Sequence, residues 1–336
     1  MCQVPLQAIL LCHVEPGSIQ GRTVVYGFER TEGIVQGLPR ILEFADRLGV
    51  PMGLAMTPQA LQLTDLDLAG HDVGLHIHPQ DPVLSKRVMG QLRPSHDGLG
   101  RYPPADQARL IAASREIFEE RTGRSPRLFV AGRWSEDAAT AALLRREGFT
   151  HDGSALPGHR SPYADWSRLP RLAQPYSPSA DDYQVRGSEP YVYLPVYQGL
   201  WGHHLTPEIL LDVGASYFRA ALDEARVGGA DVVHMYLHSP LGLDSRAMAA
   251  FEEIIGYVRE DLGLSFVLPT SLRPSVQPRS RPFPPAYWAR MGITMMKSFA
   301  GRGELGRRLM GAGPSGTDWD GATAPPEWKP PSSGAP

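Results

Sequence analysis

The chain alternates short aliphatic runs with longer amphipathic stretches over most of its length. Aliphatic and β-branched residues cluster into runs of four to eight, whereas the stretches between them place apolar residues three and four positions apart. The runs predict strands at residues 8–14, 52–56, 72–78, 128–131, 191–196, 231–238 and 265–268. The stretches predict helices at residues 35–48, 105–121, 136–147, 207–226 and 245–261.

This alternation predicts an α/β protein with a parallel sheet. A strand, a helix and a second parallel strand form a right-handed crossover, so the helices cover the sheet. With about seven such units, a closed or nearly closed barrel is favoured over an open sheet. Residues 79–104 and 154–190 are longer than packing needs and follow strand ends, where barrel loops form the active face. We expect both segments to wall a binding site.

The end of the chain differs in composition. Residues 311–336 contain 11 Pro and Gly in 26 positions, which leaves too few apolar residues for independent folding. We therefore expect residues 1–272 to form the barrel and residues 273–336 to form a basic and then Pro/Gly-rich tail that is partly disordered. Residues 286–299 of this tail show helical spacing within a basic stretch. Such a helix either contacts an anionic membrane surface or packs on the barrel.

Charge and cysteine content narrow the function classes. The 336 residues carry 33 basic and 36 acidic side chains, a net charge of −3, so no global positive field attracts nucleic acid. The two cysteines, Cys2 and Cys12, exclude a disulfide scaffold and fit a reducing compartment. The first residues lack the pattern of a signal peptide, and no apolar run is long enough to span a membrane. We expect a cytoplasmic protein, with peripheral contact to the inner membrane through the basic tail left open.

Two histidines end the predicted strand at 72–78. His76 and His78 lie in the motif HDVGLHIHPQ, and a spacing of two on a strand puts both imidazoles on one face. Two neutral ring nitrogens that converge in this way suit a divalent metal, with a third ligand from elsewhere. The alternative is a polar pair at a strand end.

The first strand supplies candidates for the third ligand. It ends in LLCHVEPG, where His13 and Glu15 alternate onto one face. In a parallel barrel this strand end lies at the same rim as His76 and His78. The joint occurrence of the two pairs predicts a functional centre more strongly than either pair alone.

Later strand ends carry further candidates. His238 ends its strand and can act as a general acid, whereas His234, on the same face but deeper, is expected to be a hydrogen-bonded core residue. Arg133 follows a strand and can orient a carboxylate or an anionic group, or form only a surface salt bridge. Asp152 can hold Arg133 or a metal-ligand histidine by a hydrogen bond.

The order of these motifs resembles the polysaccharide deacetylase family of carbohydrate esterases, and most closely its divergent bacterial members from surface-polysaccharide gene clusters. The resemblance rests on HVEPG at the end of the first strand, HDVGLHIHP, AGRW followed by GFTHDGS, and LHS at the end of a late strand, and it covers residues 7–268. It implies a distorted (β/α)7-type barrel and metal-dependent removal of N-acetyl groups from amino sugars.

The resemblance also implies roles for the metal motif. His76 and His78 match the metal histidines, although family members usually space them four residues apart, which would place Gln80 at the second position. His13 stands where relatives carry an aspartate base, and Glu15 stands where some carry an acidic ligand. The roles of base and ligand are interchangeable between these two residues.

The remaining motifs match the family in part. Asp152 and His238 correspond to a supporting acid and to the general-acid histidine. Arg133 departs from the family pattern, because many members carry an arginine where Val130 stands.

The resemblance therefore implies a metal-dependent hydrolase that uses zinc. This enzyme would remove an N-acetyl group from an amino sugar or a sugar-containing intermediate of surface-polysaccharide biosynthesis. Glu15, His76 and His78 would bind Zn²⁺. His13 would accept the proton of the attacking water, and His238 would protonate the departing amine. The altered motifs also permit a rival hypothesis, a catalytically degenerate carbohydrate-binding or scaffold protein on the same barrel. No nucleic-acid partner is expected, and the oligomeric state is left open.

Overall fold

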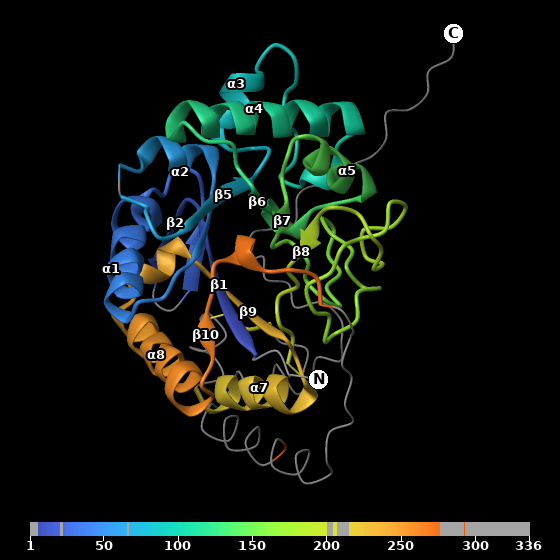
Figure 1. Ribbon diagram of the computed structural model, residues 1–336. Helices are drawn as coiled ribbons and strands as arrows, with labels where there is room; N and C mark the ends of the chain where they lie inside the picture. Colours follow the sequence, from blue (N-terminus) through green and yellow to red (C-terminus); the bar gives the residue numbers. More distant parts are fainter. Residues whose placement is uncertain are drawn as a thin grey trace.

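Helices surround a curled parallel sheet in the computed structural model of the chain (Figure 1). The structure describes residues 6–20, 23–65, 67–199, 204–206, 215–275 and 292. Its strands are β1 (Gln7–Val14), β2 (Gly17–Gln20), β3 (Thr23–Tyr26), β4 (Gly53–Met56), β5 (Asp72–Ile77), β6 (Leu128–Ala131), β7 (His151–Asp152), β8 (Val192–Tyr193), β9 (Val232–His238) and β10 (Ser265–Phe266). Its α-helices are α1 (Leu38–Leu48), α2 (Pro58–Leu63), α3 (Pro82–Val88), α4 (Pro104–Thr122), α5 (Ala138–Arg146), α7 (Ala215–Gly228) and α8 (Ser245–Gly256).

Strand β1 is the centre of the sheet. β9 pairs with one edge of β1 as far as the pair of His13 and His238. On the other edge, β10 pairs with the first two residues of β1 and β4 with its last four. The order continues through β5, β6, β7 and β8, and every pairing in this sheet is parallel. Just past β8, the Tyr197 amide donates to the His234 carbonyl at 3.0 Å and joins this end of the sheet back to β9.

The predicted α/β class and distorted barrel are confirmed by this topology. Burial on both faces of the sheet explains the continuous apolar runs in the sequence. Residues Ala8 to Cys12 of β1 are completely buried, because side chains fill the barrel interior while helices cover its outside. On the outside, α1 and α8 pack through Phe44 and Phe251, whose ring centroids are 5.9 Å apart.

The structure adds short elements that periodicity does not predict. The β2–β3 hairpin and helices α2 and α3 are absent from the predicted set. Helices α2 and α3 have six and seven residues, fewer than two turns, so they contain no repeating apolar pattern. They begin instead at side-chain caps, Thr57 and Asp81, which accept hydrogen bonds from amides of the first turn. The predicted strand at 191–196 shortens to β8, and the predicted helix at 207–226 is described only from Ala215 onward.

Packing against the barrel continues slightly beyond the predicted boundary at residue 272. Leu272 is buried, and the Ser275 amide donates to the Pro175 carbonyl at 2.8 Å. The predicted tail helix at 286–299 and the remainder of the tail lie outside the described residues, apart from residue 292. Within the described residues, none of the helices has the length and apolar character needed to cross a bilayer.

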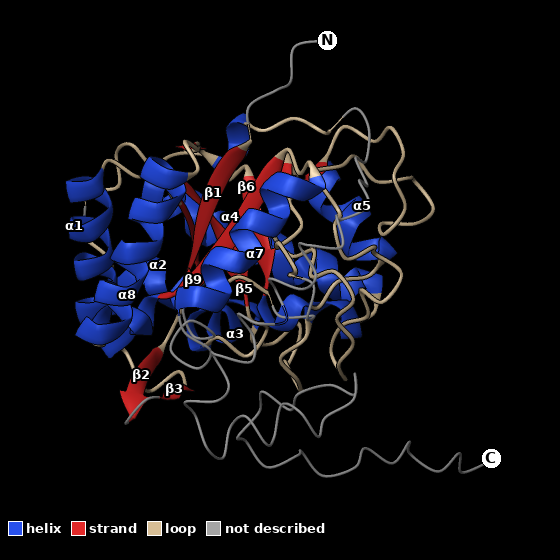
Figure 2. Ribbon diagram, turned by 90° about the horizontal axis from the view of Figure 1, so that it is seen from below, coloured by secondary structure: helices blue, strands red, loops and turns tan. Residues whose placement is uncertain are grey.

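The segments that follow β1 and β9 are locked together at the carboxyl end of the barrel. The hairpin of β2 and β3 projects from this end (Figure 2). A Cβ added to Gly37, in the π-helical turn before α1, would lie 2.2 Å from the Ser239 carbonyl oxygen. This contact leaves no room for a side chain, so the backbone after β9 rests directly on the backbone that follows the hairpin. The close packing gives the strand ends a fixed geometry.

Gly74 on β5 tests how tightly the strands pack. An added Cβ would lie 2.3 Å from the Leu128 carbonyl oxygen of β6, so Gly74→Ala has to displace one strand from the other. We expect the free energy of unfolding, measured by urea denaturation, to fall by about 1–3 kcal/mol. Gly256→Ala in α8 is the control, because nothing lies within 4 Å of its added Cβ, and it should be neutral or slightly stabilising. Equal stability of the two variants would contradict this packing.

Candidate metal centre and active site

Three ligand atoms converge at the carboxyl ends of β1 and β5. The Glu15 carboxylate, one residue past β1, lies 3.0 Å from His78 Nε2 and 3.5 Å from His76 Nε2. The two Nε2 atoms are 3.1 Å apart, and all three side chains are buried. Within the part of the chain that the structure describes, this is the one group whose ligand atoms lie close enough together to hold a metal ion.

The arrangement of these atoms fits a divalent cation. A tetrahedral metal with bonds of about 2.0–2.2 Å keeps its ligand atoms roughly 3.3–3.6 Å apart, close to the observed 3.0–3.5 Å. His76 Nδ1 donates to the Val130 carbonyl oxygen at 3.0 Å, which leaves the lone pair of the neutral ring on Nε2. His78 Nδ1 donates to Asp97 at 2.7 Å and leaves Nε2 facing the same point. A carboxylate and two imidazoles are a donor set that zinc takes in catalytic sites.

The charges of the site also favour a cation. Burial alone would raise the pKa of Glu15, but hydrogen bonds with His76 and His78 hold this pKa well below its ordinary value. Burial would lower the pKa of His78, but the Asp97 carboxylate and Glu15 outweigh it and raise this pKa to about 10. Burial lowers the pKa of His76. The centre therefore attracts positive charge, which either a proton or a metal ion supplies.

His13 lies one layer deeper in the barrel than Glu15. Its ring centroid is 4.9 Å from that of His76 and 5.0 Å from that of His238, and the ring stacks on Tyr236 at 5.2 Å. Burial, followed by the neighbouring His76 and His238, lowers the pKa of His13 well below its ordinary value, so the ring is neutral at pH 7. Its Nε2 atom is buried and makes no hydrogen bond to any residue that the structure describes. This nitrogen is available for proton exchange with a bound molecule.

His238 borders the site on the β9 side. Its Nε2 atom lies 3.4 Å from Glu15 Oε1, and its ring packs edge to face against Tyr26 of the hairpin, with centroids 5.3 Å apart. The next residue, Ser239, joins β9 to β1. Its hydroxyl donates to the Glu15 carbonyl at 3.1 Å and accepts from the Glu15 amide at 3.2 Å. The backbone of the carboxylate ligand is thus fixed by the same strand end that presents His238.

A strained turn after β6 forms another side of the site. Arg133 and Trp134 both have a φ of 57°, in the left-handed region, which costs of the order of 1–3 kcal/mol for each non-glycine residue. The turn brings the Trp134 ring to 5.2 Å from the ring of His13. It also directs Arg133 Nε to Asp97 at 3.2 Å. Both side chains therefore depend on the strained backbone for their contacts.

The carboxylate that joins Arg133 to a metal-ligand histidine is Asp97, whereas the sequence suggested Asp152 for this role. Asp97 lies between α3 and α4, in the predicted wall at 79–104, and hydrogen-bonds both Arg133 and His78. A single aspartate in a loop has no sequence pattern around it, so only the tertiary contacts reveal it. Asp152 instead accepts a hydrogen bond from another part of the barrel, the Tyr191 hydroxyl, at 2.6 Å.

Comparisons with known proteins agree with the fold. No family model matches the chain. Over 166 residues the chain is 25% identical to the peptidoglycan deacetylase of Helicobacter pylori, an alignment that covers 46% of the chain and 50% of that relative. The chain thus matches only about half the length of this curated relative.

Solved structures match over more of the chain. A putative glycoside hydrolase/deacetylase from Parabacteroides distasonis has a TM-score of 0.53 and 12% identity, over 79% of this chain and 69% of that one. Puue allantoinase has a TM-score of 0.52 and 15% identity, over 80% and 89%. At such low identity these two matches show the fold alone.

The predicted resemblance to polysaccharide deacetylases is confirmed. On this deacetylase-like barrel the structure brings together Glu15, His76, His78, His13 and His238, five of the residues that the sequence singled out. Arg133 reaches the group through Asp97. The two-residue spacing of the histidines still delivers both Nε2 atoms to one point, because His78 directly follows the strand that carries His76.

A second titratable cluster lies at the same end of the deacetylase-like barrel. Glu136 and Asp152 are both buried, and their carboxyl groups lie close enough to interact. Tyr193 donates to Glu136 at 2.8 Å, and Tyr191 donates to Asp152. Burial, and then the charge of Asp152, raises the pKa of Glu136 well above its ordinary value, and burial also raises the pKa of Asp152. Two buried carboxyl groups in contact share one proton, because two negative charges there would repel.

Two histidines outside the site, His234 and His151, hydrogen-bond to backbone carbonyl groups. His234 Nδ1 donates to the Leu194 carbonyl at 2.8 Å, as expected of a core residue. His151 at the start of β7 lies 3.1 Å from the Leu272 carbonyl oxygen through its Nε2 atom. These bonds tie β9 and the end of the described chain to β7 and β8.

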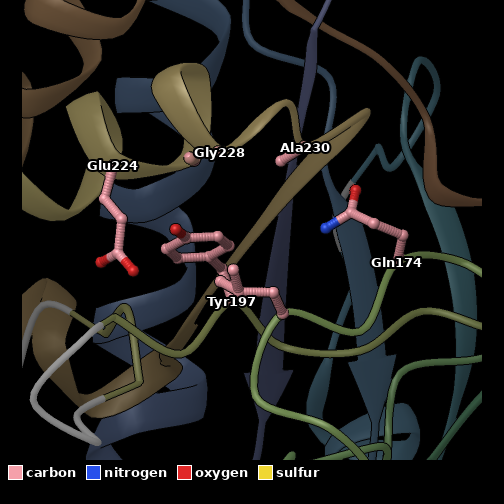
Figure 3. Close-up of a pocket in the computed structure, with 7 residues that line it drawn as sticks. Gln174, Tyr197, Glu224, Gly228 and Ala230 are labelled. Atoms are coloured by element: carbon pink, nitrogen blue, oxygen red, sulfur yellow. The ribbon is translucent and has the colours of Figure 1, made fainter. Parts of the chain in front are cut away.

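The pocket in Figure 3 lies at the opposite end of the barrel, where β9 begins. Gln174 on its wall accepts hydrogen bonds from the amides of Asp231 and Val232, both at 2.8 Å. Tyr197, Glu224, Gly228 and Ala230 also line it. Its volume of about 10 Å³ is enough for one water molecule. This pocket therefore belongs to the packing of the barrel and not to the active site.

Glu136→Gln tests the shared proton. As the pH rises above about 4.3, the ordinary pKa of glutamate, the unfolded chain releases this proton while folded Glu136 retains it. The unfolded state then binds fewer protons, so the free energy of unfolding falls with rising pH, by up to about 1.4 kcal/mol per pH unit, until the raised pKa of Glu136 is passed. Glutamine removes this titration, so we expect the variant to gain stability relative to the wild type as the pH rises from 5 to 9 in urea denaturation.

Glu116→Gln on the exposed face of α4 is the matched control for this comparison. It should show the pH dependence of the wild type. A constant difference in stability between Glu136→Gln and the wild type over the whole range would exclude the shared proton.

Proposed function

We propose that the protein is a metal-dependent deacetylase that hydrolyses the N-acetyl group of an amino sugar. The observation that carries this proposal is the convergence of Glu15, His76 and His78, all buried, with ligand atoms 3.0–3.5 Å apart. The similarity to the peptidoglycan deacetylase over half of that relative's length supports the reaction class. The resemblance of the motifs to this family supports the amino sugar as substrate.

The three ligands would leave one side of a cation open to substrate, as catalytic zinc sites do. A divalent cation held there would polarise the acetyl carbonyl and lower the pKa of the attacking water. Two nitrogen ligands and one carboxylate favour zinc over magnesium or calcium, which prefer oxygen. Glu15 would serve as the ligand, because its carboxylate contacts both histidines.

His13 would act as the general base. Its ring is neutral at pH 7 because burial lowers its pKa. Its Nε2 atom has no hydrogen-bond partner among the described residues and can accept the proton of the attacking water. This assignment follows from the position of Glu15: with the carboxylate engaged by His76 and His78, His13 is the neighbouring group that remains to take a proton. The aromatic rings of Trp134 and Tyr236 hold His13 in this place.

His238 would protonate the departing amine. It lies on the opposite strand edge of β1 from His76, and its Nε2 atom is 3.4 Å from Glu15 Oε1. The contact with the carboxylate orients the ring, and Tyr26 covers one side of it. A base and an acid on two sides of the cation are the arrangement that amide hydrolysis needs.

Metal content and acetate release test this proposal on the full chain. After dialysis against a chelator and addition of Zn²⁺ or Co²⁺, we expect about one metal ion per chain and release of acetate from N-acetylglucosamine oligosaccharides. His76→Ala should lose both the metal and the activity. His13→Ala and His238→Ala should keep the metal and lose activity by about 10²–10⁴-fold.

His71→Gln is the control, because His71 lies at the other end of β5 and bonds to the Met52 amide. It should leave both measurements unchanged. Less than a tenth of an equivalent of metal after reloading would exclude the metal centre. Full metal content without acetate release would favour the rival hypothesis, a carbohydrate-binding or scaffold protein. Wild-type activity in His13→Ala or His238→Ala would overturn the assigned roles.

A further inference from the structure

Asp97 is a buried carboxylate that contacts the candidate metal ligand His78 at Nδ1, the ring nitrogen that does not face the other ligands. It lies in the loop between α3 and α4 and is 8% exposed. Its Oδ2 atom accepts hydrogen bonds from His78 Nδ1 at 2.7 Å and from Arg133 Nε at 3.2 Å. One oxygen atom thus connects a candidate metal ligand to the arginine of the strained turn.

The two histidines of the centre are oriented in different ways. His76 belongs to β5, and its Nδ1 atom donates to the neutral Val130 carbonyl of the neighbouring strand. His78 lies just beyond β5, where no strand partner holds its ring, and its Nδ1 atom donates to a carboxylate instead. A carboxylate acceptor keeps the hydrogen on Nδ1, directs the Nε2 lone pair forward and makes the imidazole a stronger ligand.

The strained turn supports the same histidine from a second direction. A Cβ added to Gly132 would lie 2.8 Å from ring atoms of His78, so this turn is in close contact with the ring. Arg133 keeps a left-handed φ of 57°, a conformation that glycine adopts without strain. Its guanidinium also lies over the Tyr163 ring, 5.7 Å from the centroid. The presence of arginine at such a position indicates that its side chain is used.

We propose that Asp97 is a positioning residue that raises the affinity of the centre for a divalent cation by fixing His78, and that Arg133 holds its carboxylate in place. The inference rests on the metal centre of the proposed function, but it concerns cation binding and not turnover. The proposal also assigns a function to the long loop at 79–104, because this loop places Asp97 next to Nδ1 of the candidate metal ligand His78.

The Zn²⁺ affinity of the full chain tests the proposal, measured by competition with a chromogenic chelator. Asp97→Asn retains an oxygen that accepts from His78 but removes its charge, so we expect the dissociation constant for Zn²⁺ to rise by about 10–100-fold. Asp106→Asn is the matched control, because Asp106 also pairs with an arginine, Arg109, but lies on α4 away from the centre. Its affinity should equal that of the wild type.

A spectroscopic readout separates positioning from general stability. In ¹H–¹⁵N NMR spectra of the Zn²⁺-bound protein, the Nδ1 hydrogen of His78 should exchange slowly with water in the wild type, because the Asp97 carboxylate accepts it. In Asp97→Asn the same hydrogen should exchange faster with water. The visible spectrum of the Co²⁺ form should change with it, because the imidazole then meets the cation at a different angle.

Arg133→Met provides an independent comparison, since it leaves Asp97 and removes only its anchor. We expect a smaller loss of Zn²⁺ affinity than in Asp97→Asn, roughly threefold or more. If Asp97→Asn does not fold, Arg133→Met is the variant that tests the proposal. Unchanged Zn²⁺ affinity in the folded variants, with the Nδ1 hydrogen of His78 exchanging as in the wild type, would overturn the proposal. Weaker Zn²⁺ binding by the variants than by the wild type supports the positioning role of Asp97 even when no acetate is released. The failure of this proposal can therefore be distinguished from the failure of the proposed function.

Discussion

Three buried groups that can each accept a hydrogen bond point at one another at one end of the barrel. The Glu15 carboxylate and the Nε2 atoms of His76 and His78 lie 3.0–3.5 Å apart. Such an arrangement is stable only with positive charge at its centre, because buried lone pairs and a carboxylate otherwise repel one another. The nearby backbone and side chains serve to hold these three groups in place.

Strand β1 connects these three groups to the rest of the fold. It carries Glu15 and His13 to the end of the barrel and pairs with β9 over its whole length as far as His238. The hydroxyl of Ser239 then bonds to both the amide and the carbonyl of Glu15. The carboxylate, the candidate base and the candidate acid are therefore parts of one rigid strand pair, which favours chemistry that needs a fixed separation between proton donor and acceptor.

Strain and burial are concentrated on the other side of the site. Arg133 and Trp134 occupy left-handed backbone conformations, and the surrounding contacts compensate for the cost. Trp134 packs against His13, while Arg133 bonds to Asp97 and through it supports His78. The buried pair of Glu136 and Asp152 lies near the same strand ends but has its own hydrogen-bond partners, Tyr193 and Tyr191. The barrel thus separates two groups of titratable residues, of which only one has the geometry of a metal centre.

Much of the fold could be predicted from the sequence because the central strands are local features. Continuous apolar runs, such as Ala8 to Cys12, mark strands that are buried on both faces, and their alternation with amphipathic stretches requires a parallel sheet. The short helices α2 and α3 could not be predicted in this way, since they depend on capping by Thr57 and Asp81 and not on periodicity.

The candidate site, like the fold, could be predicted from the sequence only in part. The positions of the strand ends in the sequence already place five residues at one end of the barrel, because strand ends in a parallel barrel share a rim. These residues are His13, Glu15, His76, His78 and His238. Three features became visible only in the folded molecule. Glu15 meets both histidines, Asp97 takes the place suggested for Asp152, and His13 lies deeper, with no hydrogen-bond partner for Nε2 among the residues that the structure describes. Residue spacing sets which face of a strand a side chain occupies, whereas the partner of a loop residue depends on how the chain folds back in space.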